Sequence, residues 1–309
     1  MSPVPFKHIL EHGPMLRALG ATALGAMRGP ASSEKPATPG PWIETEAKAP
    51  SAALVRAFVA FTKGDQVSYR GVLPPHLFPQ WTLASASLAL GGLPYPLARI
   101  VNAGVMLRIH DQLPAGEPLL VRARLASIDE SPSRVVLATH IETGTKAVPD
   151  ALVAELRTYV PLGNTANGER STRGNPEKKP ERSAAPSVAD RARELAYLHV
   201  PANAGLEFAK LTGDFNPIHW IPAYAKAAGF KACILHGFGE FAYATSALVR
   251  GLLAGDPGKL RGVEARFTKP FVLPGKMGIY VTDAGELFAG DAPGGAAYLA
   301  GRFEIGGST

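Results

Sequence analysis

The feature that most constrains the fold of this chain is a pattern that occurs twice, 158 positions apart (108 to 266). Arg108-Ile109 followed by a Pro-Ala-Gly turn parallels Arg266-Phe267 followed by a Pro-Gly turn. After each turn comes a segment that alternates apolar and polar residues, which is typical of a half-buried β-strand. A repeat much longer than a 20 to 50 residue solenoid unit indicates two copies of a domain.

Each copy shows the same order of elements, a short helix, a longer apolar helix and then several strands. The longer helices are expected over Trp81 to Leu90 and from Gly237 to about Ala254, where apolar residues recur every three or four positions. This order favours an α+β fold in which an antiparallel sheet wraps around one central helix in each half. The strands of the first half are expected over Val101 to His110, Pro118 to Ile128, Arg134 to Glu142 and Ala151 to Val160.

The 309 residues are enough for two domains of ordinary size, each with its own core. Residues 1–50 form an ambiguous N-terminal extension, whose stretch from Pro30 to Pro50 looks like a connector. We expect a first domain over 51–162, a flexible linker over 163–188 that is rich in Gly, Ser, Asn and charged residues, and a second domain over 189–309.

Composition excludes several classes of protein. The net charge is +6, but half of this excess lies in residues 163–193 and no basic stripe with interleaved aromatics occurs, so no nucleic-acid partner is expected. Gly71 to Ala98 lacks charged residues but holds five prolines, which favours protein core over a membrane span. The N-terminus lacks the apolar centre of a signal peptide. A single cysteine, Cys233, excludes an intrachain disulfide and fits a reducing, cytoplasmic location.

The residues that carry chemistry lie between Leu211 and Glu240. Asp214 and His219 are five positions apart with Asn216-Pro217 between them, and the proline disfavours helical backbone before it. A bent loop can therefore turn the carboxylate and the imidazole toward a shared water. His236-Gly237 opens the second long helix, whose first N–H groups lack intrahelical acceptors and can donate to a developing oxyanion.

The run Leu211-Thr-Gly-Asp-Phe-Asn-Pro-Ile-His219, followed by Leu235-His-Gly237, resembles the hydratase motif of the MaoC-like, (R)-specific enoyl-CoA hydratase (hydratase 2) family. A later segment, Arg266 to Gly275, also resembles this family, and the likeness covers about residues 190–305. It implies two fused hot-dog domains and a thioester substrate on CoA or an acyl carrier protein. In this family the matching residues give Asp214 and His219 as the catalytic pair, Asn216 as the residue that orders water and the Gly237 amide as the donor to the thioester oxygen.

The resemblance implies reversible syn hydration of a trans-2-enoyl thioester to an (R)-3-hydroxyacyl thioester. Which of Asp214 and His219 activates the water stays open. A hot-dog thioesterase and a non-catalytic acyl-CoA-binding protein are the alternatives. Fused members of the family keep one catalytic motif per chain, and the first half here lacks the motif, so we expect a structural role for its His76. We also expect the first half to hold the acyl tail near Leu83, Leu88 and Leu90, although these leucines are equally expected as core.

Other residues have simpler interpretations. Asp214 and Asn216 could merely cap the following turn, since both types do this often. Arg266 and Lys269 are candidates for binding substrate phosphates, with solvated surface charge as the alternative. His236 is expected to be structural or capping, and Cys233 inert. No metal site and no cofactor beyond the thioester carrier are expected, because Asp214 and His219 offer only two ligands. A homodimer is left open.

Overall fold

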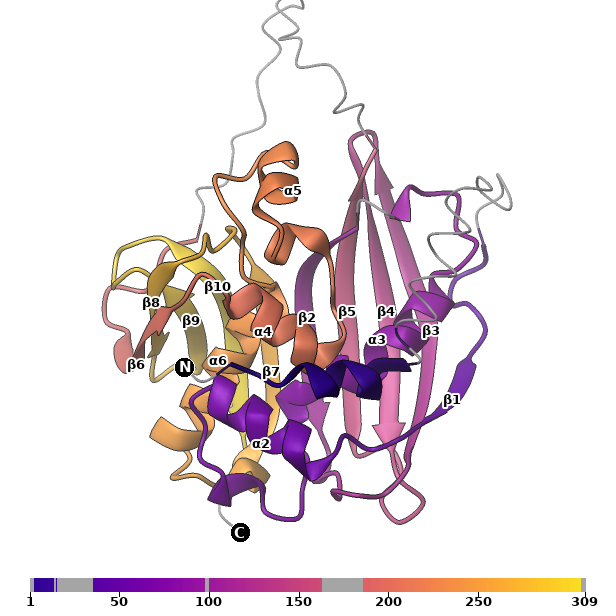
Figure 1. Ribbon diagram of the computed structural model, residues 1–309, viewed down its shortest axis with the longest axis horizontal. Helices are drawn as coiled ribbons and strands as arrows, with labels where there is room; N and C mark the ends of the chain where they lie inside the picture. Colours follow the sequence, from indigo (N-terminus) through magenta and orange to yellow (C-terminus); the bar gives the residue numbers. More distant parts are fainter. Residues whose placement is uncertain (1–2, 14, 16–35, 98–99, 163–185, 307–309) are drawn as a thin grey trace, which may run out of the picture.

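The computed structural model describes residues 3–13, 15, 36–97, 100–162 and 186–306. The fold is built on one antiparallel sheet of ten strands, in the order β1-β3-β4-β5-β2-β7-β10-β9-β8-β6. The helices lie on one side of this sheet (Figure 1). The predicted α+β class is confirmed. Within the described residues no helix has the length and apolar content needed to cross a membrane.

Within the described residues, the first half of the chain forms five strands and two α-helices. Ser51 caps the first helix by accepting the Leu54 N–H, and Pro79 occupies the first turn of the second, where its missing N–H costs nothing. The elements are β1 (Ile43–Ala47), α2 (Ala52–Phe61), the short 3-10 turns η2 (Val67–Tyr69) and η3 (Pro75–Leu77), α3 (Pro79–Ala89), β2 (Val101–Ile109), β3 (Leu119–Ser131), β4 (Arg134–Gly144) and β5 (Leu152–Pro161).

The second half repeats this plan. Its central helix α6 is buried on nearly every side, and β6 to β10 curve around it (Figure 1). The elements are β6 (Arg193–Val200), α4 (Ala204–Thr212), η5 (Pro217–His219), α5 (Pro222–Ala227), α6 (Gly237–Gly251), η6 (Pro257–Lys259), β7 (Leu260–Phe267), β8 (Gly275–Val281), β9 (Glu286–Gly290) and β10 (Ala297–Ile305).

The two halves join edge to edge through β2 and β7. These strands pair antiparallel, with Val105 opposite Ala265 and Leu107 opposite Val263. The side chains on the inner face of both strands enter one apolar cluster, which also holds Phe58 and Phe78 of the first half and Phe238 and Phe241 of the second. The expectation that each half buries its own separate core is therefore wrong for the main core, which both halves build together.

Two N-terminal segments are ordered against this body. The 3-10 helix η1 (Phe6–His12) packs on α4, and β1 pairs antiparallel with β3 at one edge of the sheet. The expectation of a connector over residues 30–50 is wrong for 43–47, because Ile43, Thr45 and Ala47 turn inward and alternate with exposed glutamates in a strand pattern. Most of the predicted linker, 163–185, lies outside the described residues.

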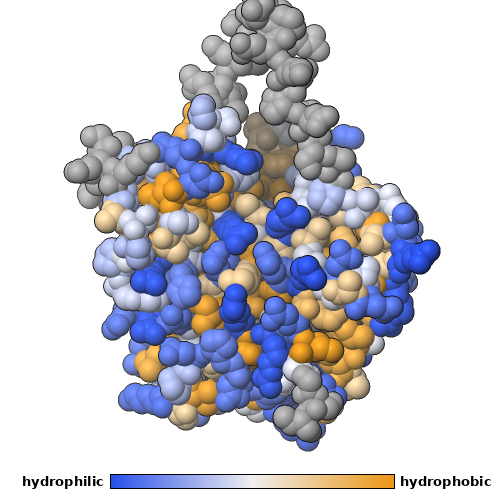
Figure 2. Space-filling model, turned by 180° about the vertical axis from the view of Figure 1, so that it is seen from behind, coloured by the Kyte–Doolittle hydropathy of each residue, from blue (hydrophilic) through white to orange (hydrophobic). Residues whose placement is uncertain are grey.

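The outer face of the sheet is polar. Arg122 of β3 pairs with Glu142 of β4, and Arg157 of β5 bonds Glu155 and lies 3.8 Å from Glu264 of β7. Figure 2 views the molecule from behind and shows hydrophilic side chains spread over it, with smaller apolar patches between them. The chemistry-bearing residues lie on the opposite, helix-covered side.

Candidate active site

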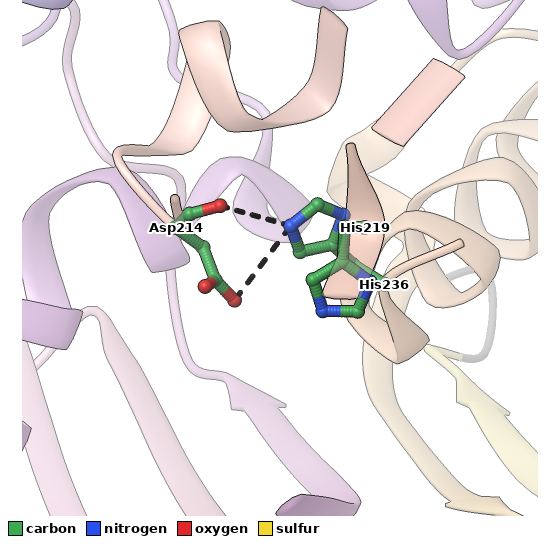
Figure 3. Close-up of side chains that lie close together, drawn as sticks. All are labelled: Asp214, His219 and His236. Carbon is green, nitrogen blue, oxygen red and sulfur yellow. Dashed lines mark hydrogen bonds and ion pairs between the residues drawn. The ribbon is translucent and has the colours of Figure 1, made fainter. Parts of the chain in front are cut away.

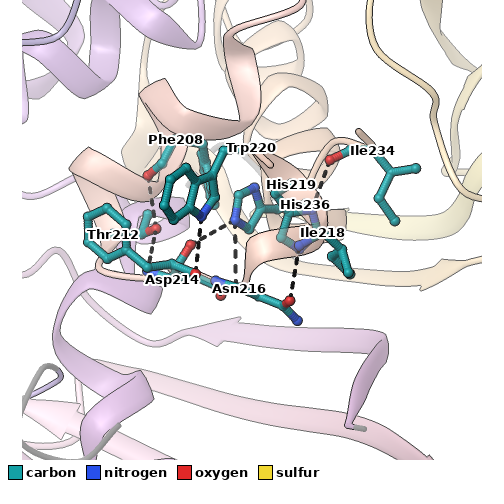
Figure 4. Close-up of polar contacts among 10 residues, drawn as sticks. Phe208, Thr212, Asp214, Asn216, Ile218, His219, Trp220, Ile234 and His236 are labelled. Carbon is teal, nitrogen blue, oxygen red and sulfur yellow. Dashed lines mark hydrogen bonds and ion pairs between the residues drawn. The ribbon is translucent and has the colours of Figure 1, made fainter. Parts of the chain in front are cut away.

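The predicted catalytic loop begins where α4 ends. Gly213 has φ +82, a left-handed conformation that glycine adopts without strain and that ends the helix. Asp214 follows, and its Oδ1 accepts the Asn216 N–H at 3.3 Å. The Asn216 Oδ1 in turn accepts the Ile218 N–H at 3.3 Å and caps η5 (Figure 4). The capping interpretation thus holds for Asn216, and a role in holding water would use its remaining amide N–H groups.

A short hydrogen bond orients the His219 ring. Its Nδ1 lies 2.8 Å from the carbonyl oxygen of Ile234. A carbonyl oxygen only accepts, so Nδ1 carries the proton and, in the neutral ring, Nε2 keeps its lone pair. The ring is 8% exposed and lies in η5, so His219 contributes to packing as well as chemistry, contrary to the expectation of a plain loop residue.

His236 belongs to the site, which sequence reasoning missed. Its ring stacks on that of His219, with centroids 3.5 Å apart and planes 23° apart. Its Nε2–H donates to the main-chain carbonyl of Asp214 at 2.9 Å and lies 4.0 Å from the Asp214 Oδ2 (Figure 3). As the residue before α6 it makes no side-chain cap, so the capping interpretation is wrong. The only sequence signal was its place next to Gly237.

Burial sets the protonation of the two histidines. It lowers the pKa of His219 below the ordinary 6.5, although the nearby Asp214 partly raises it again. Burial, with His219 beside it, lowers the pKa of His236 further. Among the described residues His236 Nδ1 has no hydrogen-bond partner, as expected for a neutral ring that carries its proton on Nε2. At neutral pH both rings are therefore uncharged.

Gly237 begins α6 directly after His236. Its N–H is the first of the helix and has no acceptor within it. A Cβ at Gly237 would lie 2.6 Å from the Phe267 ring, so the glycine is required by packing against β7. The main-chain amide still lies at the positive end of the helix, next to His236.

Glu240 lies in the first turn of the same helix and is fully buried. Burial raises the pKa of its carboxyl well above 4.5 and favours the neutral acid. A neutral side chain leaves the positive end of α6 uncompensated, which suits a helix end that must receive developing negative charge.

Other predicted residues lie away from this cluster. Arg266 is exposed on the outer face of β7, because it alternates with Ala265 and Phe267, which face inward. Lys269 is exposed and its Nζ lies 5.7 Å from the Tyr298 ring centroid. Both side chains thus point to solvent and stay candidates for binding substrate phosphates. Cys233 is buried, and the pKa of its thiol is raised by burial, in keeping with an inert role.

The three leucines proposed for the acyl tail do not share one environment. Leu83 is half-buried against the main core, Leu88 is 50% exposed, and Leu90 is buried in a smaller cluster with Leu93 and Leu137. A surface groove of about 880 Å³ lies between α2, the 66–72 turn and residues 115–118, and its lining includes none of the predicted site residues. The acyl tunnel stays a prediction.

The cluster brings together three possible metal ligands, one more than the sequence suggested. Ligand atoms of Asp214, His219 and His236 all lie within 4.8 Å of one another. Two stacked rings keep their nitrogen lone pairs in nearly parallel planes, whereas the ligands of one tetrahedral ion must converge on it. His236 Nε2 also uses its proton on the Asp214 carbonyl. The donor geometry fits proton transfer better than metal binding.

The part of the chain that holds this cluster resembles known proteins. Residues 174–283 match the model of the MaoC like domain. Peroxisomal enoyl-CoA hydratase 2 of Arabidopsis thaliana is 27% identical over 209 residues, which are 63% of this chain and 64% of that protein, so the chain spans slightly less than two thirds of it.

Two solved structures of Mycobacterium tuberculosis proteins share the fold. HtdX superposes with a TM-score of 0.65 at 20% identity, over 85% of this chain and 99% of HtdX. A conserved hypothetical protein described as having a double hot-dog fold gives a TM-score of 0.53 at 15% identity, over 87% of this chain and 96% of its own. This chain is therefore a double hot-dog protein that carries a MaoC-like domain in its second half.

Proposed function

We propose that this protein adds water to the double bond of a trans-2-enoyl thioester and removes it in the reverse direction, giving an (R)-3-hydroxyacyl thioester. The observation that carries the proposal is the pairing of the Asp214 carboxylate with a neutral His219 whose Nε2 is free to accept a proton. The name of the Arabidopsis relative, enoyl-CoA hydratase 2, supports the same chemistry. The (R) configuration rests on the family resemblance.

The reaction follows from these groups. A water between the Asp214 carboxylate and His219 Nε2 has two acceptors for its hydrogens, so its oxygen lone pair is directed at C3 of the enoyl group. The oxygen bonds to C3 as one proton passes to an acceptor, and the C2–C3 π electrons shift toward the thioester oxygen. The Gly237 N–H, at the positive end of α6, stabilises this enolate oxygen. The held proton then moves to C2, so that one water is added in all.

One oxyanion donor of this kind contributes roughly 2.7 to 4 kcal/mol of transition-state stabilisation in acyl-transfer enzymes. General acid–base catalysis adds a factor of about 10² to 10⁴ in rate. We propose that the Asp214 and His219 pair supplies the acid–base catalysis and that the Gly237 N–H supplies the oxyanion donor. Both are needed because the proton at C2 must be transferred while the negative charge of the enolate is stabilised.

We further propose that the thioester is carried by CoA or by an acyl carrier protein. Arg266, exposed on β7, and Lys269, just beyond β7, remain candidates for contact with the carrier. A cytoplasmic location and a homodimer also remain predictions.

The experiment is a direct comparison of hydration with thioester cleavage. Purified protein is mixed with a 2-enoyl-CoA, and the absorbance of the conjugated thioester is followed together with release of free thiol. Loss of the conjugated absorbance without thiol release, and a product one water heavier by mass spectrometry, supports the proposal. Thiol release at the rate of absorbance loss would instead identify a thioesterase, and binding without turnover a non-catalytic protein.

A further inference from the structure

A segment at the start of the chain covers the helix that leads into the catalytic loop. We call residues Pro3–His12, which include η1, the N-terminal strap. In Figure 1 it runs as the indigo ribbon across α4, and η1 packs on α4. The strap lies more than 190 positions away in sequence from the α4 residues it contacts and has no part in the family motif.

One end of the strap is held by a buried ion pair. Glu207 and Lys210, three positions apart on α4, are 4% and 1% exposed, and their Oε2 and Nζ lie 2.8 Å apart. The Val4 N–H donates to Glu207 Oε2 at 2.5 Å, and Lys210 Nζ donates to the Val4 carbonyl at 2.6 Å. Buried charges are tolerated when paired and fully hydrogen-bonded, and here the strap backbone completes the pair.

The other end reaches the last turn of α4. His12 Nε2 donates to the Lys210 carbonyl at 2.9 Å. A Cβ at Gly213 would lie 3.1 Å from the His12 ring, so this ring rests directly on the glycine that precedes Asp214. The contacts at positions 207, 210 and 213 follow a spacing of three, which places them along one face of the helix.

The two catalytic groups have different supports. The His219 ring donates a hydrogen bond to the Ile234 carbonyl, just before α6, whereas Asp214 follows the end of α4. Of these two supports the strap contacts α4, and its Glu11 also accepts the Ser51 N–H and Oγ–H at the start of α2. α4 also touches His219, because a Cβ at Gly205 would lie 3.2 Å from the His219 Cβ. A shift of α4 therefore moves Asp214 directly and disturbs the backbone of His219 as well.

We propose that the N-terminal strap positions Asp214 for catalysis, and that Glu207 and Lys210 are positioning residues that act through it. This inference rests on the proposed function where it concerns rate. The part that concerns structure is independent of the proposed function: the strap orders residues 212–216 whatever reaction they perform.

The test compares Lys210→Met with Lys7→Met. Lys7 is exposed on the same strap, so the same substitution there removes a charge without touching the buried pair. For Lys210→Met we expect kcat for enoyl-CoA hydration to fall about tenfold or more with KM within about twofold, since a misplacement of about 1 Å can cost 10²-fold. Hydrogen exchange of the amides of residues 212–216 should rise, while exchange in α6 and β7 stays as in the wild type. Lys7→Met should match the wild type in both.

A second variant separates lost positioning from a stranded charge. Glu207→Gln/Lys210→Met removes both charges, so that no carboxylate is buried alone. Its melting temperature should recover toward the wild type, yet kcat should stay low because the Val4 carbonyl still lacks its donor.

Three results would contradict the proposal that the strap positions Asp214. The first is a wild-type kcat in folded Lys210→Met, and the second is a kcat that recovers fully in the double variant. The third is a uniform rise in hydrogen exchange over the whole protein, which would make Lys210 an ordinary core residue. If the wild type itself does not hydrate enoyl-CoA, the proposed function fails, and the local or uniform exchange pattern alone settles the inference about the strap.

Discussion

The Ile234 carbonyl decides what His219 can do. By holding the proton on Nδ1 it leaves Nε2 as the only ring nitrogen that can accept one, on the side that Asp214 also faces. His236, stacked on the ring, keeps it from turning and ties the Asp214 main chain to the same place. The catalytic pair is thus preorganised by three contacts that involve no water or substrate.

The pH dependence of hydration tests the protonation of His219. Burial lowers its pKa below 6.5, so the neutral, active ring is fully present above that value and is lost as the pH falls through the lowered pKa. We expect kcat/KM to be flat near neutrality and to decline on the acid side with a midpoint below 6.5. The check is a kcat/KM profile from pH 4.5 to 8, and a midpoint above 6.5 would contradict the assignment.

Replacing His236 by Phe tests the role of its N–H. The variant His236→Phe retains an aromatic ring against His219 but loses the donor to the Asp214 carbonyl. One net hydrogen bond is worth about 0.5 to 1.5 kcal/mol, which corresponds to a fall in kcat of up to about tenfold. His199→Phe, at an exposed position of β6, is the matched control and should keep full activity. If the His236→Phe variant keeps wild-type activity, His236 has only a packing role.

At the scale of elements, the N-terminal end of α6 combines packing with chemistry. Gly237→Ala should lower stability by about 1 to 3 kcal/mol, because its Cβ meets the Phe267 ring. The pair Gly237→Ala/Phe267→Ala removes this clash and leaves the main-chain amide in place. We expect activity to return at least partly in the double variant, measured beside its thermal melting. Full stability with no activity would instead place the thioester where the Gly237 Cβ would lie.

The sequence predicted elements well where local signals were strong. The helix expected from Gly237 to about Ala254 runs to Gly251, and the turn after Asp214 follows from Asn216-Pro217. It did not predict β1, because a five-residue edge strand in a proline-rich stretch becomes visible only through its pairing with β3. Nor did it place His236 on His219, since that contact joins residues 17 positions apart through the tertiary fold. The strap was missed for the same reason.

At the scale of the molecule, the two halves share one sheet and one main core. The β2–β7 pairing and the common apolar cluster tie them together without a separable interface. We therefore expect one cooperative unfolding transition for the whole chain, by calorimetry and by circular dichroism, with coincident midpoints. Two resolved transitions would show that the halves fold as independent units.

Acid should unfold this protein through its buried histidines. Burial lowers the pKa of His76 to about 3, so the folded state favours its neutral ring. The free energy of unfolding therefore keeps its full value above pH 6.5, the pKa of this histidine in the unfolded chain. It falls by about 1.4 kcal/mol per pH unit as the pH drops from 6.5 toward 3. His76→Gln cannot gain this charge, so its free energy of unfolding should depend less on pH between 6.5 and 4. An equal slope in both proteins would contradict this.

The central claim is that Asp214 and His219 together hydrate an enoyl thioester. The most direct measurement is the initial rate of absorbance loss of a 2-enoyl-CoA with the wild type, Asp214→Asn and His219→Gln, each verified by thermal melting. We predict that the wild type turns over and that each variant loses about 10² to 10⁴-fold in kcat. A folded Asp214→Asn or His219→Gln variant with near wild-type turnover would contradict the account.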